Sequence, residues 1–478
     1  MSRVVMFVLN DCRTDARVLR EAGTLVGAGH QVTIMARPSD LNDQRSETEQ
    51  RDGFEVVRIP VPLRWRRRAR LAAAPWRGWR LAGWWARDQL KAGPLGWARL
   101  AIAGIAALVA VPFVVVGVLV VVLARVLPGT AQLRSGIDWL VRWRSSTEEW
   151  DRAAATAAPG ADVFHGHDLN ALHAAVLARA RAGGALVYDS HEIFLESGSH
   201  ATRPGWARSI FRRREAAWVG QADALVTVND ALARELGERY LPRRVVVVHN
   251  CPPRPGPTPE ASGLLADAPG PPPAPGPLRT ALRIGADVPL ALYHGGFSKH
   301  RGLEELVAAA ALPSLDGTHV VFLGYGSQAA ELRALAAASP VADRVHVLSA
   351  VSPDVLIDWV RDADVAVMPI QDSTLNHRLS TPNKLFEALA AGVPLVASDL
   401  PELRRIVMED PAGPLGVLCD PTDPASIAAS IAELLGRPMD ERAALRERCL
   451  DAARDRWNWE TESARLVDLY ADLAASTA

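Results

Sequence analysis

The stretch "RVVMFVL" (residues 3–9), followed by "QVTIMA" (residues 31–36), decides the fold class. Between these two short apolar runs, Val18, Ala22 and Leu25 recur at the three- and four-residue spacing of a helix with one buried face. A strand, a helix and a second strand of this kind form the unit from which parallel sheets are built. We therefore predict a β-α-β unit at the N-terminus.

The same alternation of short apolar runs and helical patterns continues along the chain. Runs as apolar as these fit parallel sheets that helices cover on both faces. The fold class that this predicts is α/β, with two doubly wound domains. The further runs are "ADVFH", "ALVYD", "ALVTV" and "RVVVVH" in the first half, and "PLALYHG", "THVVFLG", "RVHVL", "DVAVMPI" and "GVPLVAS" in the second.

A proline-rich stretch separates the two halves. The chain has 478 residues, which suits two domains better than one core. Residues 252–277 contain eleven prolines, and neither a helix nor a sheet continues through such a segment. We predict an N-terminal domain over residues 1–250 and a linker over residues 251–280.

A long insert, at about residues 61–150, interrupts the first domain. Residues 100–124 are all apolar, enough at about 1.5 Å per residue to cross a hydrocarbon layer of about 30 Å. The strands before and after the insert belong to one predicted sheet, so the chain must return to the side that it left. Because Pro112 divides the run, we expect a wedge in one leaflet, with an in-plane helix pair or a full span as alternatives.

The flanks of the insert favour a membrane surface. Residues 61–99 hold ten basic side chains and one acid, and nine of the fourteen tryptophans fall within residues 65–150. Arginine and tryptophan are the residues expected at anionic bilayer interfaces. We therefore expect residues 61–144 to contact the membrane, with a buried helix or an oligomer contact as the alternative.

Composition restricts the function classes further. A net charge of −1, from 53 basic and 54 acidic residues, gives no overall attraction to nucleic acid. Four cysteines without CxxC spacing argue against a disulfide framework and a zinc module. The first apolar run is too short for the core of a signal peptide. We expect a peripheral or monotopic protein on the cytoplasmic face of the cell membrane.

Two strand ends in the first domain carry polar clusters, "HGHD" (residues 165–168) and "DSHE" (residues 189–192). Ligands of open parallel sheets bind beyond the carboxyl ends of the strands. The clusters could supply a general base, an acceptor site or a metal site, and helix capping is an equally common use of such groups. The candidate acceptor-binding residues are His165, His167, Asp168 and Glu192.

The second domain contains two glycine-bearing strand ends. In "YHGGFSKHRGLEEL", Gly295 and Gly296 let the backbone approach a ligand, and Lys299 and Arg301 can bind a diphosphate. In "FLGYGS", Gly324 and Gly326 allow close approach of a flat base or a ribose. Both stretches predict donor-binding residues.

The stretch "PNKLFEALAAGVP" (residues 382–394) predicts a helix whose first turn can bind phosphate. Proline at its start leaves backbone N–H groups available at Asn383, Lys384 and Leu385, and Lys384 adds a positive charge. Glu387, one turn later, can accept hydrogen bonds from ribose hydroxyls. The alternative is a surface Lys-Glu pair worth a few tenths of a kcal/mol.

Seven segments in order resemble the retaining family-4 glycosyltransferases of the GT-B fold. This resemblance implies two facing Rossmann-like domains and a nucleoside diphosphate sugar as donor, with no obligatory metal or other cofactor. It also implies a donor-binding domain over residues 281–456 and a helix over residues 457–478 that returns to the first domain. The segments are "ADVFHGHDLNAL", "YDSHEIF", "VVHNCP", "LYHGGFSKHRGLEEL", "FLGYGS", "STPNKLFEALAAGVPLVASDLPEL" and "WNWETESARLVDLY".

The resemblance also implies roles for single residues. Arg301 and Lys384 match the diphosphate-binding pair, Glu387 the ribose-binding acid, and His191 the histidine beside the donor sugar. Glu402 occupies a further motif position. The departing phosphate itself is then expected to help deprotonate the acceptor.

Three departures from the family pattern affect the site. The first acid of the E-x7-E pattern is Leu379 here, so Asn376 or His377 must supply its sugar contacts. Phe297 stands where an arginine is common. The first loop lacks the usual Gly-Gly pair and reads "NDCRTDARV", in which the candidate acceptor-binding residues are Asp11, Arg13 and Asp15.

These observations predict a retaining hexosyl- or N-acetylhexosaminyltransferase with a lipid-linked or membrane-proximal acceptor, in polysaccharide or glycolipid biosynthesis. A nucleotide-sugar epimerase on the same fold is one alternative. A membrane-bound scaffold that binds sugar nucleotides without catalysis is another, and Leu379 is the hint for it. The base, the sugar, the acceptor and the oligomeric state are not specified by the sequence.

Overall fold

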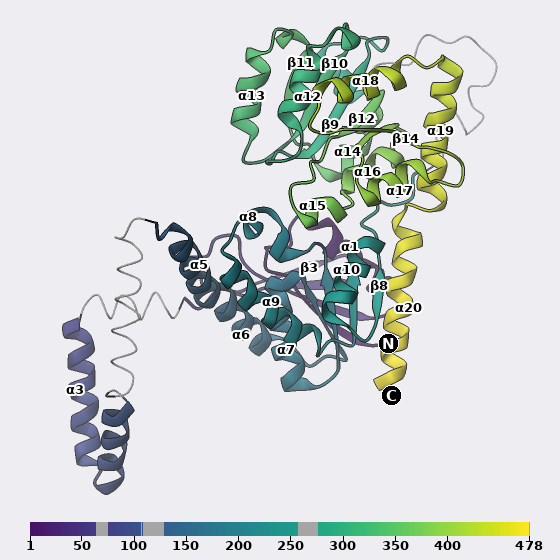
Figure 1. The fold of residues 1–478 in the computed structure, drawn as a ribbon. Helices are drawn as coiled ribbons and strands as arrows, with labels where there is room; N and C mark the ends of the chain where they lie inside the picture. Colours follow the sequence, from purple (N-terminus) through teal and green to yellow (C-terminus); the bar gives the residue numbers. More distant parts are fainter. Residues whose placement is uncertain (64–74, 107, 109–128, 257–275, 478) are drawn as a thin grey trace. The chain divides into compact units, whose positions relative to one another are not determined.

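A computed structural model of the protein describes residues 1–63, 75–106, 108, 129–256 and 276–477 (Figure 1). Contacts divide these residues into two compact units. The first comprises Met1–Asp189 and Gly198–Asp223, and the second Ser190–Ser197 and Ala224–Ser476. The domain boundaries predicted above stay a prediction.

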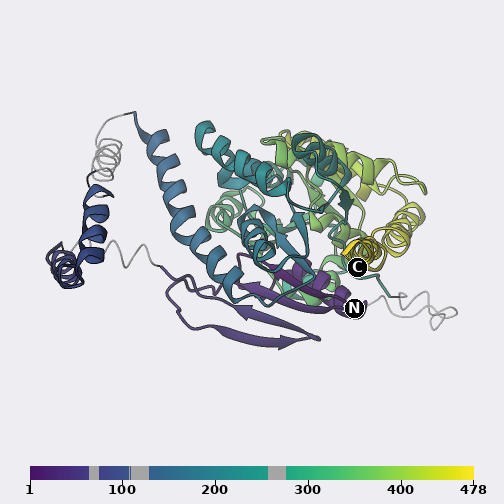
Figure 2. The same ribbon diagram turned by 90° about the horizontal axis from the view of Figure 1, so that it is seen from below.

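The first unit is built on a largely parallel sheet with the strand order β3-β4-β2-β1-β5-β6. Only β3 runs antiparallel to its neighbour, β4, and Figure 2 shows this hairpin at the edge of the sheet. The strands are β1 (Arg3–Phe7), β2 (Gln31–Ala36), β3 (Glu47–Arg51), β4 (Phe54–Arg58), β5 (Val163–His167) and β6 (Ala185–Ser190).

The predicted N-terminal β-α-β unit is confirmed. Strands β1 and β2 pair in parallel, with Val4 opposite Val32. Helix α1 (Ala16–Gly27) lies between them in the sequence, and the Asp15 carboxylate accepts a hydrogen bond from the Val18 N–H at 3.3 Å. This N-cap satisfies a backbone group that the first helical turn leaves unpaired. The other helices of the first unit are α3 (Pro75–Lys91), α5 (Ala131–Arg142), a π-helix (Trp143–Thr147), α6 (Glu148–Ala157), α7 (Asp168–Ala182), α8 (Gly198–Ala201) and α9 (Gly205–Val219).

The insert is described only in part. Helix α3 and the helical residues 94–106 lie within it, whereas most of the predicted wedge at residues 100–124 lies outside the described residues. In the part of the chain that the structure describes, no helix combines the length and the apolar character that crossing a membrane requires. The wedge stays a prediction.

The second unit contains a fully parallel six-stranded sheet with the order β11-β10-β9-β12-β13-β14. Strand β9 (Leu290–Gly296) lies near its centre, and its residues 290–293 are completely buried. The predicted second parallel α/β sheet is therefore confirmed. The other strands are β7 (Ala224–Thr227) and β8 (Val245–Val247), which pair with each other, and β10 (His319–Tyr325), β11 (Val345–Ser349), β12 (Val365–Met368), β13 (Leu395–Ser398) and β14 (Gly416–Cys419).

Helices surround this sheet and supply the rest of the core. The core is continuous from β9 to α19 and includes Tyr293, Phe322 and Phe386. The α-helices are α10 (Asp230–Tyr240), α11 (Pro277–Leu282), α12 (Leu303–Ala310), α13 (Ala329–Ala338), α14 (Pro353–Arg361), α15 (Leu375–Leu379), α16 (Asn383–Ala390), α17 (Pro401–Met408), α18 (Pro424–Leu435), α19 (Met439–Asp455) and α20 (Trp459–Thr477); short 3-10 turns span Phe194–Glu196, Pro313–Leu315 and Ala342–Arg344.

The C-terminal helix α20 is tied to residues just before the linker. The Arg244 guanidinium donates to the Asp472 carboxylate at 2.7 Å, and the Glu462 carboxylate accepts from the His249 N–H at 2.9 Å. Glu462 is buried, and despite that burial its bonds with His249 hold the pKa of its carboxyl below the ordinary value. These contacts lie within the second unit, so the predicted return of the helix to the first domain stays a prediction.

Candidate functional site

A cavity of about 460 Å³ opens in the second unit, where the carboxyl ends of β9 and β10 meet the first turn of α16. Open parallel sheets place their ligands at this edge. Arg301 and Lys384, which the sequence places more than eighty residues apart, both line this cavity. Its wall also includes His294, Gly295, Gly296, Ser298, Gly324, Tyr325, Val351, Leu356, Asn383 and Glu387.

The glycine loop after β9 creates room for the lysine. Gly295 has a φ of +111°, a backbone conformation that side chains rarely permit. A Cβ atom at this position would lie 3.4 Å from Cε and 3.6 Å from Nζ of Lys384. A larger residue would therefore be strained and would fill the space in front of the ammonium group.

Lys384 is buried at the start of α16. Its side chain is 8 % exposed, and its Nζ lies 3.4 Å from the centroid of the Tyr293 ring. Within the described ranges, Nζ has no hydrogen-bond partner. Burial, and then the charge of Arg301, lower the pKa of Lys384 well below its ordinary value, while Glu387 acts in the opposite direction. An unpaired buried amine of this kind is a group suited to a ligand.

Glu387 is positioned by a partner that the sequence analysis missed. Nε2 of His294 lies 3.0 Å from Oε2 of Glu387 and, as its N–H tautomer, donates to it. The His294 side chain is buried, whereas that of Glu387 is 24 % exposed. Tyr293 and His294 are adjacent on β9 and reach Lys384 and Glu387 respectively, so strand and helix hold the site together. The signal available in the sequence was a histidine directly before the Gly-Gly pair.

Four predicted donor-binding residues lie outside the cavity wall as the described residues define it. Lys299 is exposed to solvent, and Leu385 is completely buried in the core. Gly326 packs against the backbone of Phe297, where a Cβ atom would come within 2.2 Å of the carbonyl oxygen. Glu402 is also buried, and its contacts lie at another helix.

Glu402 caps α10. Its Oε1 accepts a hydrogen bond from the Ala231 N–H at 3.1 Å, and Arg405 donates to its Oε2 at 2.7 Å. A carboxylate at a helix N-terminus satisfies free N–H groups and the helix dipole. The structure therefore gives Glu402 a role in holding two helices, and the cavity does not use it.

Leu379, at the position of the family's first acid, makes apolar contacts instead. It packs with Leu375 against the buried cluster of Ile193, Val228 and Leu232. The position is therefore part of a small apolar core, which explains why a leucine is stable there.

The two residues that were expected to replace this acid are already engaged. The Asn376 side-chain oxygen accepts from the Ile193 N–H at 2.8 Å, and its amide donates to Glu192 at 3.4 Å. His377 is 8 % exposed and lies 2.8 Å from the Ser373 hydroxyl. Burial, and then Arg301, lower the pKa of His377 to about 4, so the imidazole is neutral at neutral pH. The predicted roles of His191 and Glu192 stay predictions.

The predicted acceptor histidines lie in a buried cluster of the first unit. His165 and His167 are at most 1 % exposed, and their rings stack at 4.3 Å. Ligand atoms of both histidines, Glu21 and Asp189 lie within 4.8 Å of one another, a grouping that a metal ion can use. Arg17 forms an ion pair with each carboxylate, at 2.9 Å from Glu21 and from Asp189, and so offsets part of their charge. This placement favours a supporting role over direct contact with an acceptor.

The remaining acceptor candidates lie in the first loop and at the start of α7. Asp15 serves as the N-cap of α1, and its acceptor-binding role stays a prediction. The Asp11 carboxylate accepts from the Ser39 hydroxyl, a bond that lowers the pKa of Asp11, and Arg13 lies 3.4 Å from Glu47. Asp168 opens α7 with a φ of +57°. The acceptor-binding roles of Asp11, Arg13 and Asp168 stay predictions.

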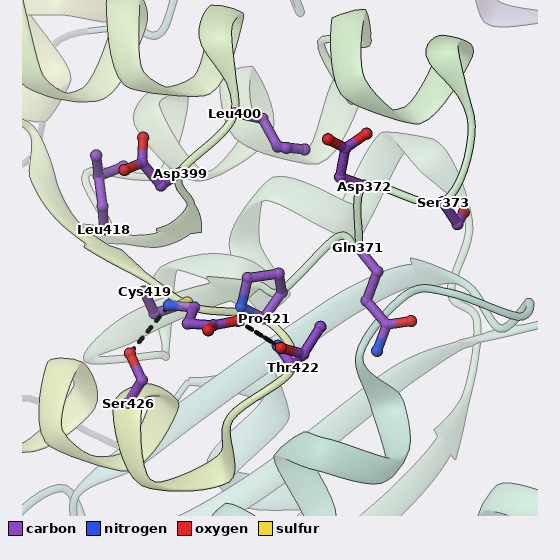
Figure 3. A pocket seen from close by; sticks show the side chains of 11 residues that line it. Gln371, Asp372, Ser373, Asp399, Leu400, Leu418, Cys419, Pro421, Thr422 and Ser426 are labelled. Atoms are coloured by element: carbon purple, nitrogen blue, oxygen red, sulfur yellow. Dashed lines mark hydrogen bonds between the residues drawn. The ribbon is translucent and has the colours of Figure 1, made fainter.

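A larger hollow of about 660 Å³ lies at the ends of β12, β13 and β14 (Figure 3). Asp372, Asp399 and Asp420 line it, and none of the described residues in its wall is basic. The Asp420 carboxylate accepts from the Thr422 hydroxyl, and the Asp420 N–H donates to Ser426. Arg404 and Arg378 pair with Asp399 and Asp372 at 2.5 Å and 3.8 Å from outside this wall, so the described wall itself offers a diphosphate carboxylates and no basic side chain.

Comparisons with known proteins agree with this architecture. A family model described as "Glycosyl transferases group 1" matches residues 288–437, and one described as "Glycosyltransferase Family 4" matches residues 115–251. The D-inositol 3-phosphate glycosyltransferase of Thermobispora bispora is 30 % identical over 391 residues, which cover 73 % of this chain and 83 % of that protein.

Solved structures share the fold at low identity. Sucrose-phosphate synthase from Thermosynechococcus elongatus superposes with a TM-score of 0.66 at 18 % identity, covering 100 % of both chains. HepE from Anabaena, in complex with UDP-glucose, gives a TM-score of 0.61 at 13 % identity, covering 99 % of this chain and 100 % of that one.

Proposed function

This chain belongs to the family-4 glycosyltransferases of the GT-B fold, and we propose that it transfers a sugar, with retention, from a nucleoside diphosphate sugar to a lipid-linked or membrane-proximal hydroxyl acceptor. One observation carries the donor half of this proposal. Arg301, Lys384 and the first turn of α16 converge on a single cavity.

The cavity suits the three parts of such a donor. Two cationic groups and the helix N-terminus attract the diphosphate. The Glu387 carboxylate, whose side chain is 24 % exposed, can accept hydrogen bonds from ribose hydroxyls. The same wall includes the apolar residues Leu323, Val351 and Leu356, which suit the faces of a base. HepE binds UDP-glucose, and uridine is accordingly the first base to test here.

The proposed reaction uses the same groups in the transition state. As the bond between the sugar and the diphosphate breaks, negative charge grows on the leaving phosphate, where Arg301 and Lys384 stabilise it. The resemblance to the family suggests that this phosphate takes the acceptor proton while His191 orients and polarises the sugar. On this proposal no metal ion is obligatory, because the cationic side chains supply the charge.

The insert supports a membrane-bound acceptor. Residues 82–108 expose large apolar side chains together with Arg87, Lys91 and Arg99, and only one acid, Asp88. Soluble surfaces rarely expose so many apolar groups together, whereas anionic bilayers bind arginine and tryptophan. The most exposed of these apolar side chains are Trp84, Leu90, Leu95, Trp97, Ile102, Ile105 and Leu108.

Localisation at the cytoplasmic face forms part of the proposal. All four cysteines are buried free thiols, a state suited to a reducing compartment. Vesicle flotation tests the membrane half directly. The wild type should float with phosphatidylserine vesicles, and the double variant Trp97→Ser/Ile102→Ser should stay at the bottom of the gradient. Met439→Ser, which removes a still more exposed apolar side chain on α19, is the control and should float.

The acceptor is tested by product analysis. The relative from Thermobispora is named for D-inositol 3-phosphate, so a phosphorylated polyol is the second candidate acceptor. Incubation with UDP-sugars and either a lipid extract or inositol 3-phosphate separates the two. A glycosylated lipid supports the proposal, and a product formed only with inositol 3-phosphate overturns its membrane half.

Incubation of the UDP-sugar without an acceptor addresses the epimerase, and binding measurements beside the acceptor assays address the scaffold. An epimerised donor would identify an epimerase. Binding of UDP-sugars without turnover on any acceptor would identify a non-catalytic scaffold, which the loss of the acid at Leu379 makes a specific alternative.

A further inference from the structure

Lys384 is the least satisfied charged group of the donor cavity. Its Nζ faces the Tyr293 ring, has no hydrogen-bond partner within the described residues and takes part in no ion pair there. The hydroxyl proton of Tyr293 already has a hydrogen-bond acceptor, because it is donated to the Gly296 carbonyl at 2.8 Å. A charged ammonium in this position would lack the hydrogen bonds that normally compensate burial.

The titratable groups around Lys384 include one carboxylate, Glu387, which favours the charged amine from a distance but forms no ion pair with it within the described residues. From β9, Tyr293 stays a neutral phenol because burial raises its pKa, and His294 is bonded to Glu387. From the loop after β9, Arg301 adds a second positive charge. Glu387 on α16 is the one carboxylate in the described wall of the cavity, and His294 already holds its Oε2.

The other elements that line the cavity add no charge near the amine. Strand β10 contributes Tyr325, which is 73 % exposed. The lining residues of α14 are Pro353 and Leu356, and Asn383 of α16 is uncharged.

Burial decides which form of the amine is stable. An ammonium ion at this position loses its hydration shell and gains no hydrogen bond in return. The contact of the cation with the aromatic ring recovers only a part of that cost. Repulsion by Arg301 adds to the cost, so the empty cavity favours the neutral amine.

The choice of lysine over arginine at residue 384 is consistent with a side chain that must be able to lose its charge. Of its 53 basic residues, 50 are arginine, and the three lysines are Lys91, Lys299 and Lys384. Arginine stays protonated in proteins, whereas a buried lysine readily loses its proton. The one fully buried basic position in the described wall of the cavity is therefore filled by the residue that can be neutral.

We propose that Lys384 is a neutral amine in the ligand-free protein and takes up one proton from solvent when a nucleoside diphosphate binds. The step forms one N–H bond, converts the amine into an ammonium group and breaks no other bond. The diphosphate supplies the negative charge that the empty cavity lacks. This inference rests on the proposed donor site and deepens it, because binding and protonation become one coupled event.

The coupling has a definite sign. At a pH above the pKa of the free amine, binding must recruit a proton, and affinity for the diphosphate falls by about tenfold per pH unit. At a pH below that pKa, the amine is already charged and the dependence disappears. The ammonium group formed on binding then lies beside the phosphate that departs in the reaction and can stabilise its charge.

Lysine-selective NMR tests the first half of the proposal in the unmodified protein. With lysine labelled at 13Cε, three signals are expected, and Lys384→Met assigns one by its loss. We expect the Lys384 signal of the free protein to report a neutral amine at about pH 8, well below the usual lysine value of about 10.4. Addition of UDP should move it to the ammonium position. Three ammonium signals in the free protein at that pH would overturn the proposal.

Calorimetry of UDP binding tests the second half. Titrations in two buffers with different ionisation enthalpies give the number of protons taken up, and we expect about one for the wild type at about pH 8. Lys384→Met and Lys384→Arg should both bind without uptake, because neither side chain can change charge. Binding by the wild type without uptake would overturn this inference alone. Absence of UDP binding by the wild type would overturn the donor site as well.

Discussion

Two hollows open along the carboxyl edge of one parallel sheet, and they differ in charge. The cavity at β9 and β10 contains Arg301 and Lys384, whereas the larger hollow at β12, β13 and β14 is lined by Asp372, Asp399 and Asp420 (Figure 3). Sheet topology creates both hollows, so neither position nor volume identifies the donor site. In the function proposed above, the basic side chains distinguish the donor cavity from the acidic hollow.

The largest effect is expected from Arg301→Ala. Arg301 keeps its charge in every state, so its loss leaves the diphosphate beside a lysine whose charge depends on a proton. We expect kcat/KM for the donor to fall by about 10²–10³-fold, as for removal of one group that stabilises a developing oxyanion. Steady-state kinetics with a UDP-sugar measures this. A fall below tenfold would contradict the assignment of the diphosphate to this cavity.

Glu387→Gln should weaken the donor through the ribose. A hydrogen bond to a charged group contributes about 1.5–3 kcal/mol, so the dissociation constant of UDP should rise by about 10–100-fold. The matched probe is 2′-deoxy-UDP, which lacks one hydroxyl. The variant should lose most of the preference for UDP over 2′-deoxy-UDP, and an unchanged preference would place the ribose elsewhere.

Leu379→Glu tests the packing of the segment that joins Ser373 of the acidic hollow to Pro382 of the donor cavity. The substitution restores the family's acid but places a carboxylate against the apolar cluster of Ile193, Val228 and Leu232. We expect the free energy of unfolding to fall by about 1–3 kcal/mol, because a polar group loses water without gaining a partner. Chemical denaturation provides the measurement, with Leu379→Met as the control. An unchanged stability would show that this cluster opens at little cost.

The smallest effect is expected in the acidic hollow. Asp372→Asn removes one negative charge there. Asp372 is exposed and lies outside the wall of the donor cavity, so salt largely screens its effect on a ligand bound in that cavity. The affinity for UDP should change by less than about twofold. Isothermal titration of UDP into this variant measures the affinity. A loss of affinity as large as that expected for Arg301→Ala would show that the diphosphate binds in the acidic hollow.

The sequence predicted the N-terminal β-α-β unit and most of the strands from their periodicity. It missed β3, which is polar, and the four-residue strand β14, both at sheet edges. Arg301 and Lys384 were candidates because they follow a strand end and begin a helix, and the resemblance to the family paired them. Tyr293 and His294 were missed because their partners, Lys384 and Glu387, lie about ninety residues away. A strand pattern shows which residues are buried but does not show which side chain they meet.

Glu402 was predicted to bind the donor, but it caps a helix outside the cavity wall, whereas the acceptor-binding roles of Asp15 and the histidines of "HGHD" stay predictions. All of them carry chemistry that ligands need and that caps and buried ion clusters need as well. A motif position alone cannot distinguish these uses. The insert is a separate case, since its apolar composition was evident while most of residues 100–124 lie outside the described residues.

A crystal structure of the protein with UDP tests the central claim most directly. The account predicts that the phosphates occupy the cavity at the start of α16, with Nζ of Lys384 and the guanidinium of Arg301 both within hydrogen-bonding distance of phosphate oxygens. Phosphates bound in the hollow of Asp372 and Asp420, or contacting only one of the two cations, would contradict it.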